Sequence, residues 1–360
     1  MTDTSSNAFF VSSTALDFVA ALSMIALSWL EHSRSPRPSI LLSGYLTLTL
    51  LFDIVQCRSL WLAAVTPLDR TFARLFTTAT AVKALVNIAE SRQKTRWLLW
   101  DATKHSPEET TGVYGLGAFF WLRNLFEMGN RKLLALDDLF PLDRSIASEN
   151  LAKRLGDQLD AHPTGGKSLG LLSAVAKVLA VPLLLPVAPR LALSGFRFAQ
   201  PFLINSVLSY LEQSPSESRT NAGYGLIGAT ILIYTGNAVS TAFYYYFQER
   251  ALWMTRGALA SVVYKKTTEC RLSHADDAAA LTLMSTDIER IRFGFLFMHD
   301  FWAAILEVSI ASWLLHRELG NAFLATIIVV LACTLVLWAS RNIAVRDRWP
   351  GWSEFRRGSG

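Results

Sequence analysis

The residues that most suggest chemistry form the run Gly165-Gly166-Lys167-Ser168, which follows Ala161-His162-Pro163-Thr164. This run fits a relaxed phosphate-loop pattern, in which backbone amides and the lysine hold phosphate oxygens. Such a loop needs a preceding strand and a following helix whose positive end faces the ligand. Residues 151–159 instead predict a polar helix, and the residues after Ser168 are apolar. We therefore expect no nucleotide site here.

A second reactive pair is His299-Asp300, which is typical of metal-binding phosphohydrolases. Those enzymes need further His and Asp ligands, and the apolar surroundings of His299 predict that it begins a membrane span. The three cysteines, Cys57, Cys270 and Cys333, lie far apart without metal-ligand or disulfide spacing. We expect no metal site, no cofactor held by this chain, and no enzyme activity of its own.

Polar residues inside apolar segments are the best remaining indication of function, because placing them in lipid is costly. Arg197 would attract an anion, and the tyrosines would give adaptable apolar contact. We expect a cavity for amphipathic or anionic small molecules, with helix–helix hydrogen bonding as an equally open alternative. The candidate cavity residues are Arg197, Gln200, Asn205, Tyr244, Tyr245, Tyr246 and Gln248.

Two carboxylates also lie in apolar segments near the start of the chain, Asp17 and Asp53. Lys83 and Arg74 lie in the next apolar segment, and an ion pair with either base would offset the cost of a charge in lipid. We therefore predict a structural role for these carboxylates.

Composition indicates the kind of molecule that positions these residues. Hydrophobic residues make up 51% of the 360-residue chain and charged residues 18%, which is typical of a polytopic membrane protein. Eleven tryptophans suit membrane interfaces. The net charge of +5 is spread as short basic clusters beside apolar runs, so we expect no nucleic-acid partner.

The predicted fold is all-α, because only fully hydrogen-bonded helices of about 20 apolar residues cross the hydrocarbon as single segments. We expect about seven transmembrane helices, of which the third is the weakest because Arg74 and Lys83 interrupt it. The predicted spans are 9–30, 40–62, 71–90, 186–211, 222–247, 295–315 and 322–340.

The apolar region 169–211 is broken by four prolines, so it does not predict one straight helix. We expect an elbow helix at the membrane interface followed by one span. Two full spans are the alternative, and they would invert the topology of everything that follows.

The distribution of basic residues decides the topology. Residues 248–292 contain seven Lys and Arg, whereas 212–221 and 316–321 contain one each. Cytoplasmic loops carry the excess of basic residues. We therefore place 248–292 in the cytoplasm, the N-terminus outside and the C-terminal tail inside.

Two polar regions complete the organisation. Residues 97–168 predict a cytoplasmic connector, in which Phe119-Phe120-Trp121 and Leu125-Phe126 have helical spacing beside Arg123. This pattern suits a helix with its apolar face in membrane lipid, and packing against neighbouring helices is an equal alternative. Residues 341–360 are polar and broken by Pro and Gly, so we expect a disordered basic tail.

The cytoplasmic segment 248–292 predicts two long helices that continue the flanking spans and turn around residues 273–277. Leu252, Leu259 and Val263 share one helical stripe. Asp287 and Arg290 have the i,i+3 spacing of a surface ion pair.

Three stretches of this chain resemble one family. Residues 284–291, Met-Ser-Thr-Asp-Ile-Glu-Arg-Ile, with Arg256-Gly-Ala-Leu and Tyr264-Lys-Lys before them, resemble the first cytoplasmic loop of subfamily C ABC exporters, the multidrug-resistance-associated type. Residues 45–61 and 109–139 narrow the resemblance to fungal members.

The resemblance implies ATP-driven efflux in the plasma or vacuolar membrane, with ATP and Mg bound elsewhere in the complete family member. The implied partners are nucleotide-binding domains and a second transmembrane half. The implied docking residues on the coupling loop are Asp276, Asp277, Leu283, Met284, Ser285, Thr286, Asp287 and Arg290. The family's usual Gly-Glu pair before this Met is replaced by Ala278 and Ala279.

The resemblance also divides the chain into four parts. Residues 1–96 correspond to part of an accessory membrane domain, 97–168 to the lasso, 169–340 to an incomplete first transmembrane domain, and 341–360 to the tail. We expect an N-terminal portion without ATPase domains, inactive alone. The alternative is a non-transporting remnant or a regulatory membrane protein that docks on a full-length exporter.

Overall fold

The computed structural model describes residues 3–97, 101, 105–161, 168–212, 217–269, 282–322, 324–325, 328–330, 332–337 and 340. These residues form helices and contain no strand, in agreement with the predicted all-α class. The chain divides into two compact units, Met1–Leu296 and Phe297–Gly360, and each is described by itself.

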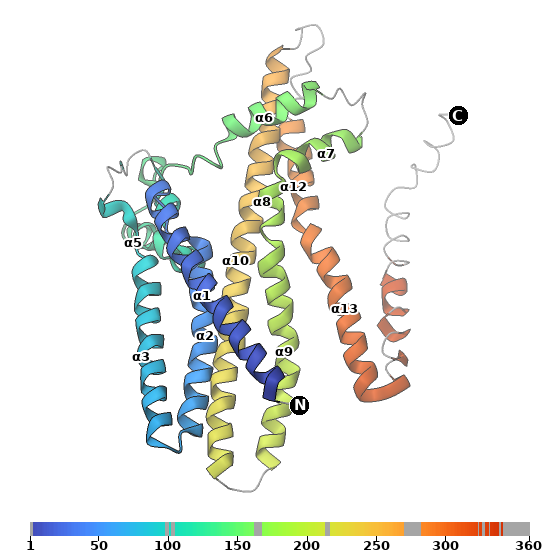
Figure 1. The fold of residues 1–360 in the computed structure, drawn as a ribbon. Helices are drawn as coiled ribbons and strands as arrows, with labels where there is room; N and C mark the ends of the chain where they lie inside the picture. The colour runs from blue at the N-terminus through green and yellow to red at the C-terminus, as the bar shows by residue number, and fades with distance from the viewer. Residues whose placement is uncertain are drawn as a thin grey trace. The chain divides into compact units, whose positions relative to one another are not determined.

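Three long helices open the first unit. The hydroxyl of Ser39 accepts a hydrogen bond from the Leu42 amide and so caps the second helix. Thr66 and Asp69 exchange hydrogen bonds as a capping box at the start of the third. The second and third pack side by side (Figure 1). The helices are α1 (Asp3–Arg34), α2 (Ile40–Ala63) and α3 (Pro67–Glu90).

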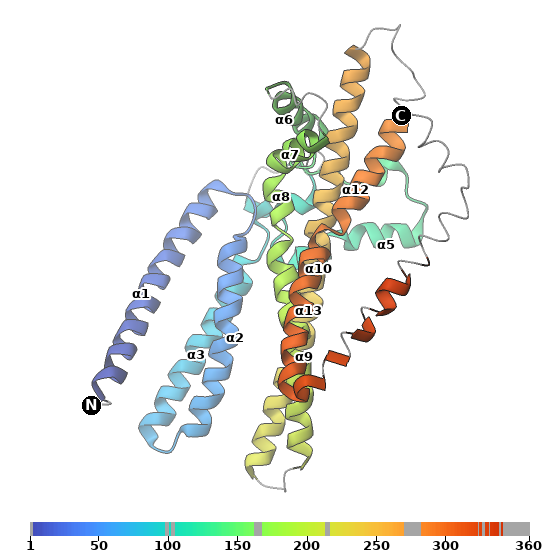
Figure 2. The same cartoon turned by 90° about the vertical axis from the view of Figure 1, so that its right-hand side faces the viewer.

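Short helices follow, none of them long enough to span a membrane. Phe119 has a left-handed backbone, with φ of 55°, so the predicted aromatic helix is interrupted at its first residue. Figure 2 shows that α5 runs across the direction of α2 and α3. The elements are η1 (Lys94–Trp97), η2 (Pro107–Thr110), α4 (Val113–Gly117), η3 (Phe120–Leu122), α5 (Arg123–Arg131), η4 (Leu136–Asp138) and α6 (Ser148–Ala161).

The next helices follow the pattern that the prolines predict, a short helix before a long one. The 11 residues of α7 are too few to cross the hydrocarbon, whereas α9 has 26 residues. α9 packs along α10. The helices are α7 (Ser168–Val178), α8 (Ala180–Leu184), α9 (Val187–Glu212) and α10 (Glu217–Glu269).

The helix that leads from the basic segment 248–292 into the next predicted span is interrupted, whereas we predicted a continuous one. A π-helical turn, η6 (Leu283–Asp287), leads into α12 (Ile288–Leu296), which ends the first unit. The chain leaves helical geometry at Phe297. The second unit then begins with α13 (Met298–Leu319) and η7 (Gly320–Ala322).

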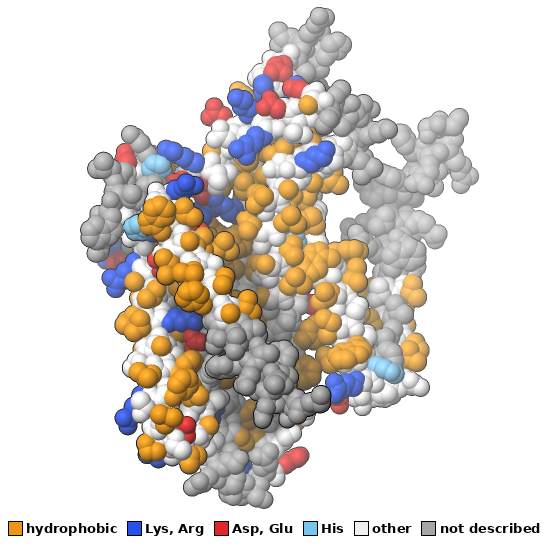
Figure 3. Space-filling view, in the orientation of Figure 1, with side chains coloured by type: hydrophobic (Ala, Val, Ile, Leu, Met, Phe, Trp, Pro, Cys, Tyr) orange, Lys and Arg blue, Asp and Glu red, His pale blue; other side chains and the backbone are white. Residues whose placement is uncertain are grey.

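The surface is that of a membrane protein. Large apolar side chains such as Phe52, Leu48 and Phe202 are exposed on the helix shafts. On the face shown in Figure 3, apolar side chains cover the shafts, and charged ones gather around α6 and the adjoining end of α10. Lipid therefore takes the place of a core partner for these helices.

Four of the described helical stretches are long and apolar enough to cross a membrane: Ile40–Ala63, Ala180–Glu212, Arg219–Glu269 and Leu283–Leu319. The helices α1 and α3 have the length but are not among these four. The last predicted span is described only in part. The integral membrane class is thus clear, and the count of seven spans stays a prediction.

Candidate functional site

Helix α10 is far longer than a membrane is thick. Its 53 residues extend about 80 Å, against about 30 Å of hydrocarbon. Its C-terminal part runs beside α6 and α12 (Figure 1). The distribution of basic residues predicts that this part is cytoplasmic, and the helix is about 50 Å longer than the hydrocarbon is thick.

The extension is braced by a group of charged and aromatic side chains, which we call the α10–α12 brace. Arg292 on α12 contacts Glu289 at 2.7 Å and Glu249 of α10 at 3.9 Å. Arg256 of α10 contacts Glu289 at 3.6 Å. Both guanidinium groups lie over the Trp253 ring, at 5.1 Å for Arg256 and 5.5 Å for Arg292. These contacts join α10 to α12.

Sequence reasoning missed the α10–α12 brace. The i,i+3 spacing of Glu289 and Arg292 was a readable signal, but nothing in the sequence pairs them with residues about forty positions earlier. Of the predicted stripe on α10, Leu252 and Leu259 are buried, which confirms that this face packs inward.

The candidate docking residues lie next to the brace. Asp287 and Arg290 form the predicted ion pair, at 3.5 Å, and the Arg290 side chain is 77% exposed. Ser285 and Thr286 are also exposed, and Met284 is half-buried. The Met-Ser-Thr-Asp string lies within the π-helical turn, a rare geometry that often marks functional sites.

The remaining docking residues divide between exposed and undescribed positions. Leu283 is 46% exposed at the start of the turn. Asp276 and Asp277 lie outside the described residues, as do Ala278 and Ala279. Docking therefore stays a prediction that rests on an exposed, charged turn at the end of a stiff helical pair.

The candidate cavity residues are distributed over two helices. On α9, Arg197 and Asn205 are exposed and Gln200 is half-buried. On α10, Tyr245 is exposed and Tyr244 is buried against the Arg190 guanidinium. The cavity of about 400 Å³ beside the α9–α10 connection is lined by other residues, among them Val207, Tyr210 and Tyr224.

Gln248 favours the helix–helix alternative. Its side chain is buried, and its amide nitrogen donates to the carbonyl oxygens of Phe295 at 3.1 Å and Leu296 at 3.0 Å. These carbonyls are at the end of α12, where helices leave acceptors unsatisfied. Tyr246 is also engaged, since its hydroxyl donates to Glu108. Tyr244 is buried as well, whereas Arg197, Gln200, Asn205 and Tyr245 stay open to a substrate role.

The predicted ion pair between the early spans is confirmed. Lys83 of α3 donates to the Asp53 carboxylate of α2 at 2.6 Å. Nothing is described for the side chain of Asp17. Asp53 and Lys83 therefore neutralise each other's charge, as expected for charged groups in apolar helices.

The run that fits a phosphate loop is preceded by α6, a helix as predicted, while residues 162–167 lie outside the described part. His299 is buried at the start of α13, where its Nδ1 accepts a hydrogen bond from Trp302 at 3.1 Å. The described residues contain no group of three or more His, Cys, Asp or Glu that would hold a metal ion.

The fold and these sites define an all-helical integral membrane protein with a braced extension outside its spans. Its homologues are fungal ABC transporters, 37–48% identical over most of the chain. The ABC-type transporter braE of Annulohypoxylon truncatum is 48% identical over 321 residues, which are 89% of this chain and 22% of that protein.

Two further relatives agree. The ABC transporter FGM5 of Gibberella zeae is 44% identical over 356 residues, covering 97% of this chain and 24% of that protein. The ABC multidrug transporter lscH of Purpureocillium lilacinum is 38% identical over 334 residues, covering 90% and 21%. This chain thus spans between a fifth and a quarter of these relatives. No protein-family model matches it.

Proposed function

We propose that this chain is the N-terminal membrane portion of a subfamily C type exporter that uses ATP to move amphipathic or anionic small molecules out of the cytoplasm. Its homology to fungal ABC transporters supports the class, and its similarity to lscH, a multidrug transporter, supports the kind of substrate. The membrane is the plasma or vacuolar membrane. ATP and Mg bind to nucleotide-binding domains, which are the partners of this membrane portion.

The observation that carries the proposal is the braced extension of α10 and α12. A turn at the end of two helices locked by charge pairs transmits a push along their length, because a packed helix pair bends little. The docking residues Leu283–Asp287 and Arg290 are the surface that receives this push from a nucleotide-binding domain. The α9–α10 pair then carries it to the substrate path.

Arg197, Gln200, Asn205 and Tyr245 are the side chains that we assign to the substrate path. They are exposed or half-buried on α9 and α10, so the second transmembrane half can cover them. Arg197 supplies positive charge for an anion, and Tyr245 supplies an adaptable apolar surface.

The test replaces the matching residues of full-length FGM5 by this chain and measures ATP-dependent uptake of a fluorescent organic anion into inside-out vesicles. We expect uptake with the chimera, and none with the purified chain alone, which should also neither bind nor hydrolyse ATP. Lys167→Ala should change no nucleotide-dependent property. A well-folded, surface-inserted chimera without uptake, or ATP binding that Lys167→Ala removes, contradicts the proposal.

A further inference from the structure

The connector lies between helices α2 and α3 on one side and helix α10 on the other, and it contacts both sides. On one side the Tyr114 hydroxyl is within hydrogen-bonding distance of Thr47 on α2 and accepts a hydrogen bond from Asn87 on α3 at 2.6 Å. Thr111 accepts from Gln93 at 3.2 Å just beyond α3. Asn87 is buried, so this side of the connector covers the parts of α2 and α3 around Thr47 and Asn87.

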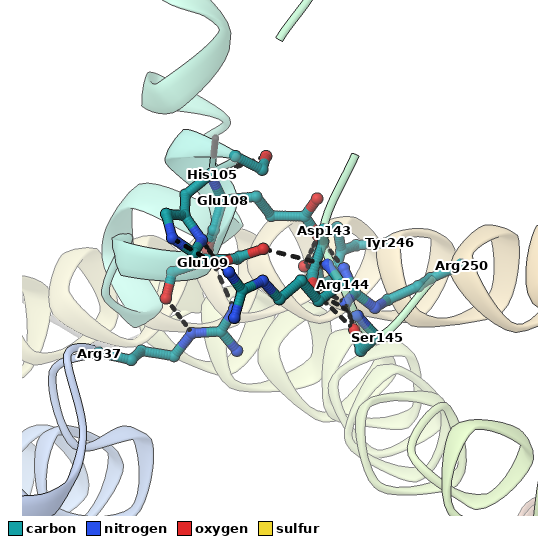
Figure 4. A network of polar contacts seen from close by, with 10 residues as sticks. Arg37, His105, Glu108, Glu109, Asp143, Arg144, Ser145, Tyr246 and Arg250 are labelled. Atoms are coloured by element: carbon teal, nitrogen blue, oxygen red, sulfur yellow. Dashed lines mark hydrogen bonds and ion pairs between the residues drawn. The ribbon is translucent and has the colours of Figure 1, made fainter. Parts of the chain in front are cut away.

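On the other side the connector contacts α10 (Figure 4). Arg250 donates to the carboxylates of Glu108 and Asp143, and to the Ser145 hydroxyl at 2.5 Å. The Tyr246 hydroxyl, one helical turn earlier, also donates to Glu108. The Arg250, Glu108 and Asp143 side chains are only 15%, 10% and 7% exposed, so one guanidinium joins two carboxylates largely away from water.

Further contacts hold the connector in shape around this point. Arg37, in the turn between α1 and α2, donates to the backbone carbonyls of Glu108 at 3.0 Å and Glu109 at 3.1 Å. The Glu109 carboxylate lies 3.0 Å from the His105 ring and accepts the Arg144 amide at 3.1 Å. The two stretches that supply Glu108 and Asp143 are thereby fixed to each other.

Two glycines show how closely the connector approaches the end of α3 and helix α10. A Cβ added at Gly112 would lie 2.9 Å from the backbone carbonyl oxygen of Ser91, just after α3. A Cβ added at Gly117 would lie 2.9 Å from the Phe243 ring of α10. Helix α4, between these glycines, therefore fills the space between α3 and α10 without room for a larger residue.

We propose that Glu108, Gly112, Tyr114, Gly117 and Asp143 form a two-sided clamp that ties the accessory helices α1–α3 to α10, with Arg250 as the positioning residue on which it closes. An arginine suits this role because its planar guanidinium presents separate donors to two carboxylates in a fixed geometry, whereas a lysine offers a single compact ammonium group. A movement of α10 then displaces the parts of α2 and α3 that contact the connector. A movement of these parts likewise displaces α10. The inference does not rest on the export activity, because it concerns contacts within this chain.

The experiment compares Arg250→Met with Arg256→Met in the full chain. Both remove an arginine of α10, but Arg256 contacts Glu289 and Trp253 in the α10–α12 brace rather than the connector. We expect amide hydrogen exchange in residues 105–118 to rise about tenfold or more in Arg250→Met, and not in Arg256→Met. Arg250→Lys should give a smaller rise, and it serves if Arg250→Met does not fold.

The connection between α2 and α10 is tested by measuring the distance between spin labels at Leu48 on α2 and Val239 on α10. Both positions are exposed. The distance distribution should broaden in Arg250→Met and stay narrow in Arg256→Met. The contact of Arg58 on α2 with the Asn221 carbonyl remains in both variants. Faster exchange in 105–118 with an unchanged α2–α10 distance would overturn the clamp, as would equal effects of the two variants.

Discussion

The Asp143 carboxylate shows how a single residue sets the pH range of the clamp. Burial, the largest influence, raises the pKa of this carboxyl, but the hydrogen bonds from Arg250 and Ser145 and the charge of Arg250 together hold it below its usual value. Since the folded pKa is depressed, the stabilisation is present above the ordinary aspartate range and is lost as pH falls through the folded pKa.

We therefore expect the difference in thermal stability between the parent and Asp143→Asn to be constant from about pH 5 to 8, to decrease as the pH falls below about 4, and to vanish only below the folded pKa. Thermal unfolding of both proteins across this range measures it. A difference that disappears already between pH 6 and 7 would show that another group holds Arg250.

The Asp53–Lys83 pair is the second residue-scale test. Lys83→Met leaves the Asp53 carboxylate alone in the hydrocarbon and should destabilise the chain by about 2–3 kcal/mol. The double variant Asp53→Leu/Lys83→Met should unfold near the parent, because a buried pair is often replaced by apolar residues without loss. Equal stability of the single variant and the parent would mean that water reaches the pair.

At the scale of the elements, Gln248 decides how α10 and α12 are joined. Replacing its amide in Gln248→Met leaves the last carbonyls of α12 without their donor, which costs about 1–3 kcal/mol for buried groups. We expect a lower unfolding temperature and little change in the KM for substrate in the transporting chimera. Asn205→Leu, at an exposed position of α9 assigned to the substrate path, is the comparison variant and should instead raise the KM without lowering the unfolding temperature.

A raised KM with unchanged stability in Gln248→Met would return this residue to the substrate path. The opposite result would leave Arg197, Gln200, Asn205 and Tyr245 as the residues that face substrate.

The elements were largely predictable from the sequence because lipid imposes a simple rule on helix length and composition. The prolines before α9 marked its start, and the carboxylate in α2 led to its partner in α3. The interruption at Phe297 had no such clear signal, since Phe297 lies in the apolar run Phe295–Met298 and the nearest glycine, Gly294, is three residues earlier. The left-handed Phe119 was equally unreadable, because such a backbone is uncommon for a bulky residue.

Across the whole molecule, whether a site could be predicted from the sequence depends on how far apart its residues lie along the chain. The Asp287–Arg290 pair could be predicted because both residues share one turn. The clamp joins residues more than a hundred positions apart, such as Glu108 and Arg250, and only the packing of α4 against α10 brings them together. Sequence patterns report local periodicity, so contacts of this range fall outside what they indicate.

In the proposed function, the turn at Leu283–Arg290 receives force from a nucleotide-binding domain through the charge of Asp287. Asp287→Lys should abolish ATP-dependent uptake in the chimera while leaving expression and ATP binding intact. As a control on the brace, Glu249→Gln should have a smaller effect, because Arg292 keeps its pair with Glu289.

The most direct measurement is uptake by the exchange variant Asp287→Arg/Arg290→Asp, which keeps an i,i+3 ion pair but reverses its charges. If a partner domain recognises the negative charge at position 287, uptake stays lost although thermal stability returns to the parent value. If uptake returns together with stability, Asp287 serves only as the ion-pair partner of Arg290, and the account of this turn as the docking surface is contradicted.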